Sequence, residues 1–239
     1  MTQTRIALVT GATSGIGRAA ALALARDGIK VLVHGRDSDR GAAVVKEIES
    51  AGGTAEFRAA DLADVHALKQ LAASVGEVDV LVNNAGFSWF GPTADLDTDT
   101  FDELLAANVR SAYYLTAALA PQMAERGQGV VINLGSMAGQ IGLAGGAAYS
   151  ATKAALAAFT RSWAAEYSPR GVRVNTIAPG PVYTGGSSRE SLTALGKTTL
   201  LSRTAEAEEI GDVIAFLASP AAGYLTGAVI PVDGGRTAI

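Results

Sequence analysis

Apolar residues along this chain fall into short continuous runs, separated by longer alanine-rich stretches with helical periodicity. Seven of the runs are rich in Val, Ile and Leu and lack strict polar alternation, as expected for strands covered on both faces. We expect strands at 5–10, 30–34, 54–58, 78–83, 129–134, 172–178 and 228–232, and helices near 15–26, 38–51, 64–75, 101–125, 148–168 and 206–218. This alternation predicts an α/β fold, a doubly wound parallel sheet of seven strands with helices on both faces.

One segment departs from the alternation. Residues 183–200 read YTGGSSRESLTALGKTTL, are rich in Gly, Ser and Thr, and lie between the sixth predicted strand and the last predicted helix. A long, weakly patterned loop in a compact domain is usually functional or mobile. We therefore expect a single domain over residues 1–239, with a substrate lid at 183–204.

Composition narrows the classes of function. A chain of 239 residues with 49% hydrophobic side chains suits one domain with a substantial core. The net charge of −4, without a dense block of Lys or Arg, argues against a nucleic-acid surface. The lack of cysteine excludes disulfides and thiolate catalysis. With only two histidines, His34 and His66, far apart in the sequence, no histidine-rich metal site is expected, and an ion bound by carboxylates is the alternative left open.

No segment has the pattern of a signal peptide or a membrane span. The apolar run at the start of the chain is too short for a signal peptide. The charge-free run 127–152 is long enough to cross a bilayer, but glycines, Asn133 and Gln140 interrupt it, so we interpret it as strand and loop. We expect no membrane partner and a cytoplasmic location.

A glycine-rich turn follows the first predicted strand and opens the first predicted helix. In TGATSGIG, Gly11, Gly15 and Gly17 allow positive φ, close approach of a pyrophosphate and tight packing of helix on strand. The helix N-terminus adds N–H donors and a partial positive charge. The spacing differs from G-x-G-x-x-G, and Ile16 stands where a P-loop has its second glycine. The position of the turn in a βαβ unit favours a dinucleotide.

The end of the second predicted strand bears on the choice between NAD and NADP. The sequence there reads HGRDS, and a ribose would lie about twenty residues past the glycines. Gly35 provides no carboxylate and leaves room for a 2′-phosphate, which Arg36 can bind with two hydrogen bonds. We expect NADP(H) to be preferred over NAD(H). Asp37 is the alternative ribose ligand, and a solvated loop charge is the alternative interpretation of Arg36.

Tyr149 precedes Lys153 by four residues in the helical stretch AAYSATKAAL, so both lie on one helix face. An ammonium about 4 Å from a phenolate attracts it by roughly 4 kcal/mol at an effective dielectric constant near 20. That energy corresponds to roughly three pKa units, which would bring the phenol towards neutrality. Such a phenol can donate or accept a proton near pH 7. Taken alone, such a pair is more often a solvated helix edge.

With these pieces together, the sequence resembles the short-chain dehydrogenase/reductase family along essentially its whole length. The matching stretches are TGATSGIG (10–17), DL (61–62), NNAG (83–86), Asn108, INLGS (132–136), YSATK (149–153), VNTIAPGPVYT (174–184) and VDGG (232–235). The length suits the single-domain type, and the pattern is similar to 3-oxoacyl-carrier-protein reductase-like members. The resemblance implies a Rossmann-type fold and hydride transfer between nicotinamide and a carbonyl or secondary alcohol.

The resemblance also implies which residues bind the cofactor and which carry the reaction. The cofactor-binding set is Gly11, Thr13, Ser14, Gly15, Ile16, Gly17, Arg36, Asp61, Leu62, Asn84, Ala85, Gly86, Tyr149, Lys153, Pro179, Gly180, Val182 and Thr184. Tyr149 is the implied general acid/base and Lys153 lowers its pKa. Ser136 would steady the substrate oxygen, and Asn108 would hold a water that links Lys153 to solvent. A hydrolase role for Ser136 is disfavoured, because LGSMA is not G-x-S-x-G and neither histidine is expected nearby.

The expected partner is a small carbonyl or alcohol substrate. Its pocket should be walled by 87–90, 137–147 and 183–200, whose small and apolar side chains suggest an uncharged or weakly polar compound. By resemblance the two alanine-rich helices around 101–125 and 148–168 form a subunit interface, of a homotetramer or a homodimer. Two other functions remain open: a non-catalytic dinucleotide sensor, and a lyase or epimerase with transient oxidation of the cofactor.

Overall fold

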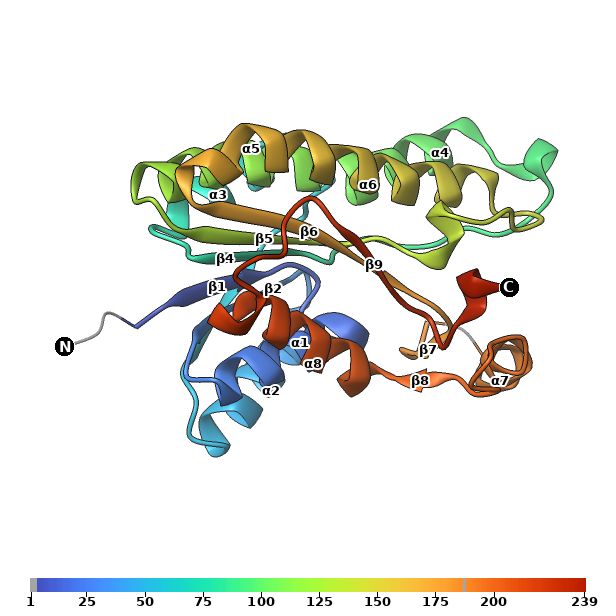
Figure 1. The fold of residues 1–239 in the computed structure, drawn as a ribbon, viewed down its shortest axis with the longest axis horizontal. Helices are drawn as coiled ribbons and strands as arrows, with labels where there is room; N and C mark the ends of the chain where they lie inside the picture. Colours follow the sequence, from blue (N-terminus) through green and yellow to red (C-terminus); the bar gives the residue numbers. More distant parts are fainter. Residues whose placement is uncertain (1–3, 187) are drawn as a thin grey trace.

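The computed structural model describes residues 4–186 and 188–239; residues 1–3 and Ser187, which falls within the predicted lid, lie outside the described part. Seven parallel strands form one sheet in the order β3-β2-β1-β4-β5-β6-β9 (Figure 1). They are β1 (Ile6–Val9), β2 (Lys30–Gly35), β3 (Ala55–Ala59), β4 (Val80–Asn83), β5 (Gly129–Leu134), β6 (Val172–Pro179) and β9 (Val229–Val232). The reversal of strand order beside β1 places the sheet's switch point between β1 and β4.

Helices cover both faces of this sheet, with α3, α5 and α6 on one side and α1, α2 and α8 on the other (Figure 1). The helices are α1 (Gly15–Arg26), α2 (Ser38–Ser50), α3 (Val65–Ser74), α4 (Thr98–Leu105), α5 (Ser111–Glu125), α6 (Ala147–Tyr167), α7 (Arg189–Gly196) and α8 (Ala207–Ala218). Short 3₁₀ turns occupy Thr93–Asp95, Met137–Gly139, Ser168–Arg170, Pro220–Ala222 and Arg236–Ala238. No helix in these ranges is long and apolar enough to cross a membrane.

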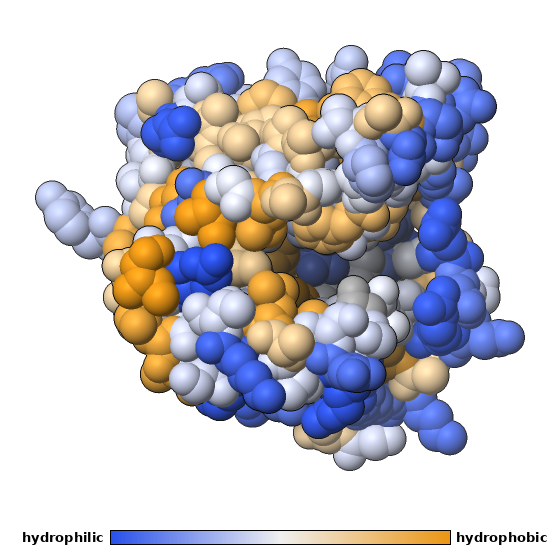
Figure 2. Space-filling view, turned by 90° about the vertical axis from the view of Figure 1, so that its right-hand side faces the viewer, coloured by the Kyte–Doolittle hydropathy of each residue, from blue (hydrophilic) through white to orange (hydrophobic). Residues whose placement is uncertain are grey.

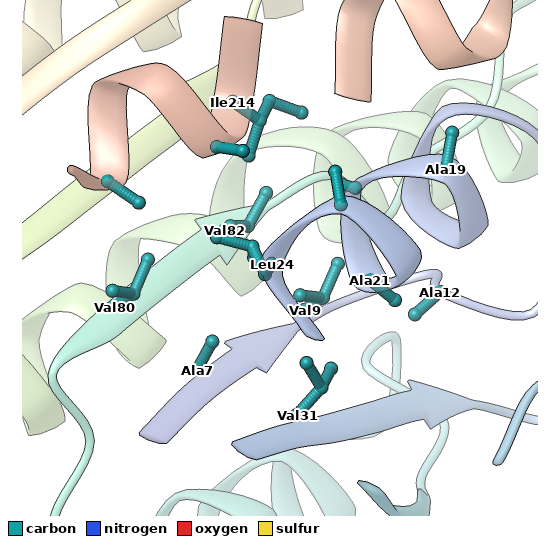
Figure 3. Close-up of a cluster of buried hydrophobic side chains, with 14 of the residues drawn as sticks. Ala7, Val9, Ala12, Ala19, Ala21, Leu24, Val31, Val80, Val82 and Ile214 are labelled. Carbon is teal, nitrogen blue, oxygen red and sulfur yellow. The ribbon is translucent and has the colours of Figure 1, made fainter. Parts of the chain in front are cut away.

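The core is split by the sheet into two clusters. On β1, Ala7 and Val9 pack into one cluster while Leu8, between them, packs into the other. Successive strand residues point to opposite faces, so a strand buried on both faces must be apolar throughout. Figure 3 shows the first cluster, where Leu24 of α1 and Ile214 of α8 lie over the strands. The fold class expected from the sequence is confirmed.

Two segments differ from the expectation. The helix expected at 101–125 begins at Thr98 and is interrupted by a π-helical turn, Ala106–Arg110, between α4 and α5. The segment 183–200, expected to be a loop, contains α7, where the Ser188 hydroxyl accepts the Ser191 N–H at the N-cap. Its Gly, Ser and Thr content conceals this helix. Two short strands, β7 (Val182–Tyr183) and β8 (Ala205–Glu206), pair at the base of the segment.

Candidate active site

A cavity of about 1360 Å³ opens at the carboxyl ends of the strands. Figure 2 shows it as a hollow between the upper and lower parts of the face that lies on the right in Figure 1. Every residue of the expected cofactor-binding set lines it: Gly11, Thr13, Ser14, Gly15, Ile16, Gly17, Arg36, Asp61, Leu62, Asn84, Ala85, Gly86, Tyr149, Lys153, Pro179, Gly180, Val182 and Thr184. Parallel strands end at one edge of the sheet, which is why residues so far apart in sequence meet here.

The glycine-rich turn is packed so closely that side chains would not fit. Gly11 has a φ of 63°, in the left-handed region. A Cβ on Gly17 would lie 2.2 Å from the carbonyl oxygen of Gly11. Asn84, which directly follows β4, holds the turn in place. Its side-chain amide donates to the carbonyl oxygens of Thr10 and Gly11, at 2.8 and 3.2 Å. The turn leaves the N-terminus of α1 bare at the cavity, which suits a diphosphate.

His34 holds the other side of the same turn, a position that sequence reasoning did not assign to the site. Its Nδ1 accepts the Gly11 N–H at 3.2 Å, and its Nε2 lies 3.2 Å from the carbonyl oxygen of Ala60. The imidazole is therefore neutral, with its proton on Nε2. Burial lowers the pKa of His34 to about 4, against weaker opposing effects of the Ala60 hydrogen bond and Asp61. A polar residue within the apolar run KVLVH was the available signal.

This geometry predicts a pH-dependent stability. The unfolded chain protonates His34 below about pH 6.5, whereas the folded chain resists until about pH 4. The unfolded state thus binds more protons between these values, so stability falls as the pH falls through this window, by about 3 kcal/mol in total. His34→Gln, which can keep both hydrogen bonds, should remove this contribution. Urea denaturation between pH 7 and pH 4 measures it.

The exposed His66 on α3 supplies a matched control for this experiment. His66→Gln should leave the free energy of unfolding at pH 7 as it is in the unmodified protein, which controls for the effect of a histidine-to-glutamine change by itself. Equal slopes for the unmodified protein and His34→Gln would contradict the buried, neutral state of His34.

The tip of β2 differs in part from the expectation. Gly35 is buried, and a Cβ there would lie 2.4 Å from Cγ2 of Thr13, so its small size makes room for Thr13. Arg36 is exposed at the cavity. Asp37 caps α2, since its carboxylate accepts the N–H groups of Asp39 and Arg40.

Arg40, which sequence reasoning did not select, also lines the cavity. It lies in the first turn of α2, four residues after Arg36. The Asp37 carboxylate accepts from the Arg40 guanidinium at 2.9 Å. The carboxylate of Asp37 is therefore engaged with α2 and Arg40 and not with Arg36. Two guanidinium groups consequently border the cavity where β2 ends.

Ser136, Tyr149 and Lys153 share one wall of the cavity. Ser136 follows β5, and its Oγ accepts the Ala138 N–H at 3.1 Å, which leaves its proton available for another acceptor. Lys153 is buried, with Nζ 2.7 Å from the Leu134 carbonyl oxygen and 5.7 Å from the centre of the Tyr149 ring. The helix spacing of Tyr149 and Lys153 thus places both beside the end of β5.

The sequence predicts that Lys153 lowers the pKa of Tyr149 towards neutral pH. In the free protein, the pKa of Tyr149 shifts in the opposite direction. Burial raises the pKa of Tyr149, while the Ser136 hydroxyl acts in the opposite direction. Burial also lowers the pKa of Lys153 to about 8. Both groups lose hydration in the same wall, and the Lys153 ammonium is directed at a carbonyl. In the free protein Tyr149 therefore keeps its proton at neutral pH.

Asn108 lies behind the cavity wall, in the π-helical turn between α4 and α5. Its Oδ1 accepts the Phe87 N–H at 2.9 Å, and its Nδ2 donates to the Phe87 carbonyl at 2.8 Å and to Thr152 Oγ1 at 3.1 Å. The side chain thus joins the segment after β4 to the helix that carries Tyr149 and Lys153. The expected water relay through Asn108 stays a prediction.

Comparison with known proteins agrees with this geometry. The chain is 38% identical over 237 residues to a 3-oxoacyl-[acyl-carrier-protein] reductase of Synechocystis, covering 97% of this chain and 96% of that one. It superimposes on a solved short chain dehydrogenase/reductase family protein with a TM-score of 0.91 at 44% identity, covering 98% of each chain. A blue fluorescent protein from a metagenomic library, solved with NADPH, gives 0.91 at 34% identity, covering 97% of each chain.

A model of the short chain dehydrogenase family matches residues 5–193, which include the glycine-rich turn, the Ser136 strand end and the Tyr149–Lys153 helix. The match covers most of the chain and both ends of the cavity. The protein therefore belongs to the short chain dehydrogenase family of oxidoreductases.

Proposed function

We propose that this protein is an NADP(H)-dependent oxidoreductase that interconverts a carbonyl group and a secondary alcohol. The observation that carries the proposal is one continuous cavity with a diphosphate cradle at one end and Ser136, Tyr149 and Lys153 at the other. When bound, the nicotinamide supplies or accepts the hydride. The glycine-rich turn and the N-terminus of α1 would hold the diphosphate, and the loop after β6, through Val182 and Thr184, would meet the nicotinamide side.

The proton chemistry follows from the protein's own side chains. The Ser136 hydroxyl, whose oxygen already accepts the Ala138 N–H, donates to the substrate carbonyl oxygen. Tyr149 donates its proton to the same oxygen as negative charge develops there, and takes the proton back in the oxidative direction. Its raised pKa suits the donating role, since the phenol stays protonated at neutral pH. Lys153 favours the phenolate once the proton has left.

The preference for NADP(H) is supported by the charges at the end of β2. Arg36 is exposed, the position before it is a glycine, and the carboxylate of Asp37 is held by α2 and Arg40. A 2′-phosphate would meet the guanidinium of Arg36, with that of Arg40 close by, and the nearby carboxylate of Asp37 is engaged with α2 and Arg40. The solved relative with NADPH bound supports the same assignment.

The reaction is tested with purified protein, a panel of ketones and secondary alcohols, and both cofactors. Turnover is followed by the near-ultraviolet absorbance of reduced nicotinamide. Reduction or oxidation of any member supports the proposal. Tight cofactor binding without turnover would favour a dinucleotide sensor instead. Cofactor retained through purification, with a substrate altered but no net change in absorbance, would favour a lyase or epimerase.

We also propose that the segment 183–204 closes over the bound ligands. Ser191, Leu192 and Leu195 of α7 line the cavity, and the Tyr183 hydroxyl, 2.7 Å from Thr193 Oγ1, ties the helix to its base. Amide hydrogen exchange in 188–200 should slow when NADPH and substrate are added, because closure excludes water. Exchange in α3, away from the cavity, should stay constant. Unchanged exchange in 188–200 would contradict closure.

Assembly into a homodimer or homotetramer is proposed through the outer faces of α4, α5 and α6. Phe101, Tyr113 and Tyr114 are exposed there, and the Tyr113 ring packs on Phe159 and Trp163. Exposed aromatic groups of this extent commonly mark protein interfaces. Light scattering should give two or four times the mass of the chain. A monomeric mass at micromolar concentration would contradict the proposal.

A further inference from the structure

The substrate end of the cavity is walled by apolar side chains from three separate segments. Phe87 and Phe90 come from the segment after β4, Met137 and Leu143 from the segment after β5, and Leu192 and Leu195 from α7. In Figure 1, α7 lies below the chain that connects β4 to α4, so these walls belong to different sides of the opening. A ligand reaching Tyr149 must pass between them.

Two aromatic rings on this wall are unusually open to solvent for cavity residues. The exposed fraction is 53% for Phe90 and 36% for Phe87. The Phe90 ring lies against Tyr149, with centroids 5.5 Å apart and the planes tilted by 57°. A substrate whose carbonyl oxygen meets the Tyr149 hydroxyl would therefore place its body beside Phe90. Burial of these rings by a ligand would be favourable.

The position of Phe90 is fixed by the backbone around it. The Gly91 N–H donates to the Gly145 carbonyl oxygen at 3.0 Å, which fastens the segment after β4 to the segment before α6. A Cβ on Gly146 would lie 3.0 Å from the edge of the Phe90 ring, so the ring is closely supported on that side. The aromatic wall is thus formed before any substrate arrives, which lowers the entropic cost of binding.

The six side chains named above that wall the substrate end, Phe87, Phe90, Met137, Leu143, Leu192 and Leu195, carry no charge. Within the described residues, the ionised side chains that line the cavity are Arg36, Arg40, Asp61, Glu103 and Lys153. Arg36 and Asp61 follow β2 and β3, and Arg40 lies in the first turn of α2, on the side where the adenosine half is proposed to bind. Lys153 is buried and donates to the Leu134 carbonyl, and Glu103 on α4 is acidic. A carboxylate or phosphate attached near the substrate carbonyl would lose hydration without gaining a cation, at a large cost.

We propose that the substrate is an uncharged ketone, or the matching secondary alcohol, with an alicyclic or aromatic body that packs between Phe90 and the Leu192–Leu195 face of α7. This inference rests on the proposed carbonyl–alcohol reaction and adds the substrate class. It assigns Phe90 as a specificity-determining residue that contacts the body of the substrate. Keto acids and sugar acids are outside the class, because they carry a carboxylate close to the reacting carbon.

Matched pairs of ketones that differ by one carboxylate test the charge argument. Cyclohexanone is compared with 4-oxocyclohexanecarboxylate, and acetophenone with 4-acetylbenzoate, each with saturating NADPH. We expect kcat/KM for the neutral member of each pair to exceed that for its partner by about a hundredfold or more. Leu192→Arg, which adds a cation to the wall, should raise kcat/KM for the carboxylates about tenfold and lower it for the neutral ketones.

The role of Phe90 is tested by truncating its ring. Phe90→Ala should raise KM for cyclohexanone and acetophenone about tenfold and leave the kinetics of acetone, which is too small to reach the ring, nearly unchanged. Phe216→Ala removes a ring of similar exposure, 45%, from α8 and should change the KM of neither the cyclic ketones nor acetone. Unchanged NADPH affinity in each variant verifies that the fold and the cofactor half are intact.

The outcomes separate this inference from the reaction on which it rests. Reduction of the carboxylates as fast as the neutral ketones would overturn the substrate class and leave the carbonyl–alcohol reaction standing. Unchanged KM values for the cyclic ketones in Phe90→Ala would overturn the assignment of Phe90. Failure to reduce any ketone with either cofactor would overturn the proposed reaction, and the substrate class with it.

Discussion

Replacing Tyr149 with phenylalanine is expected to lower kcat by at least a hundredfold and to leave the dissociation constant of NADPH nearly unchanged. The substitution removes one hydroxyl at the cavity wall and preserves the ring that packs on Phe90 at 5.5 Å. General acid/base catalysis typically contributes about 10²–10⁴-fold, so the loss should fall in that range. Steady-state kinetics and fluorescence titration with NADPH measure the two quantities.

Tyr224→Phe is the matched control, because that hydroxyl belongs to a fully exposed side chain outside the cavity and outside the helices of the proposed interface. Its kinetics should equal those of the unmodified protein. If Tyr149→Phe keeps more than about a tenth of the original rate, another group transfers the proton and Tyr149 only shapes the wall.

Replacing Arg36 with alanine should weaken NADPH binding about tenfold to a hundredfold while NADH binding stays the same. A charge-assisted hydrogen bond contributes about 1.5–3 kcal/mol, and about 1.4 kcal/mol corresponds to a factor of ten in affinity. The carboxylate of Asp37, the next residue in the sequence, accepts hydrogen bonds from Arg40 and from the N-terminus of α2. Isothermal titration with each cofactor reports the difference.

Arg161→Ala removes an exposed guanidinium from α6, outside the cavity, and should leave both affinities unchanged. Equal dissociation constants for NADPH and NADH in the unmodified protein would contradict the role of Arg36 and favour Asp37 as a ribose ligand. Adding an acid at Gly35 is a poorer test, since a Cβ there would lie 2.4 Å from Cγ2 of Thr13, so the Thr13 side chain in the glycine-rich turn would have to move as well.

Most of the sheet could be predicted because its strands are buried on both faces. In β1, for example, Ala7, Leu8 and Val9 serve two different clusters, which requires three apolar residues in succession. α7 was missed since its apolar signal consists of Leu192 and Leu195 within a polar stretch. The π-helical turn at Asn108 depends on contacts with Phe87 and Thr152 that local sequence does not encode.

The order of the motifs predicts that the site residues lie together, but it does not predict how they interact. The sequence shows that Tyr149 and Lys153 share a helix face; it does not show that both are buried, which raises the pKa of Tyr149 and lowers that of Lys153. His34 was overlooked for a related reason. Its function depends on Gly11 and Ala60, which the sheet brings to it from neighbouring strands.

Because β7 pairs with β8, the segment between them can change in length and sequence without disturbing the sheet. The polypeptide leaves the sheet region at Val182–Tyr183 and returns beside the same point at Ala205–Glu206, so everything between forms a loop closed at its base. The entropic cost of closing a loop grows only slowly with its length. Insertions, deletions or whole exchanges of this segment should therefore leave the register of the seven strands undisturbed. Exchanging this segment between relatives would therefore replace the α7 wall of the substrate pocket and leave the rest of the domain unchanged.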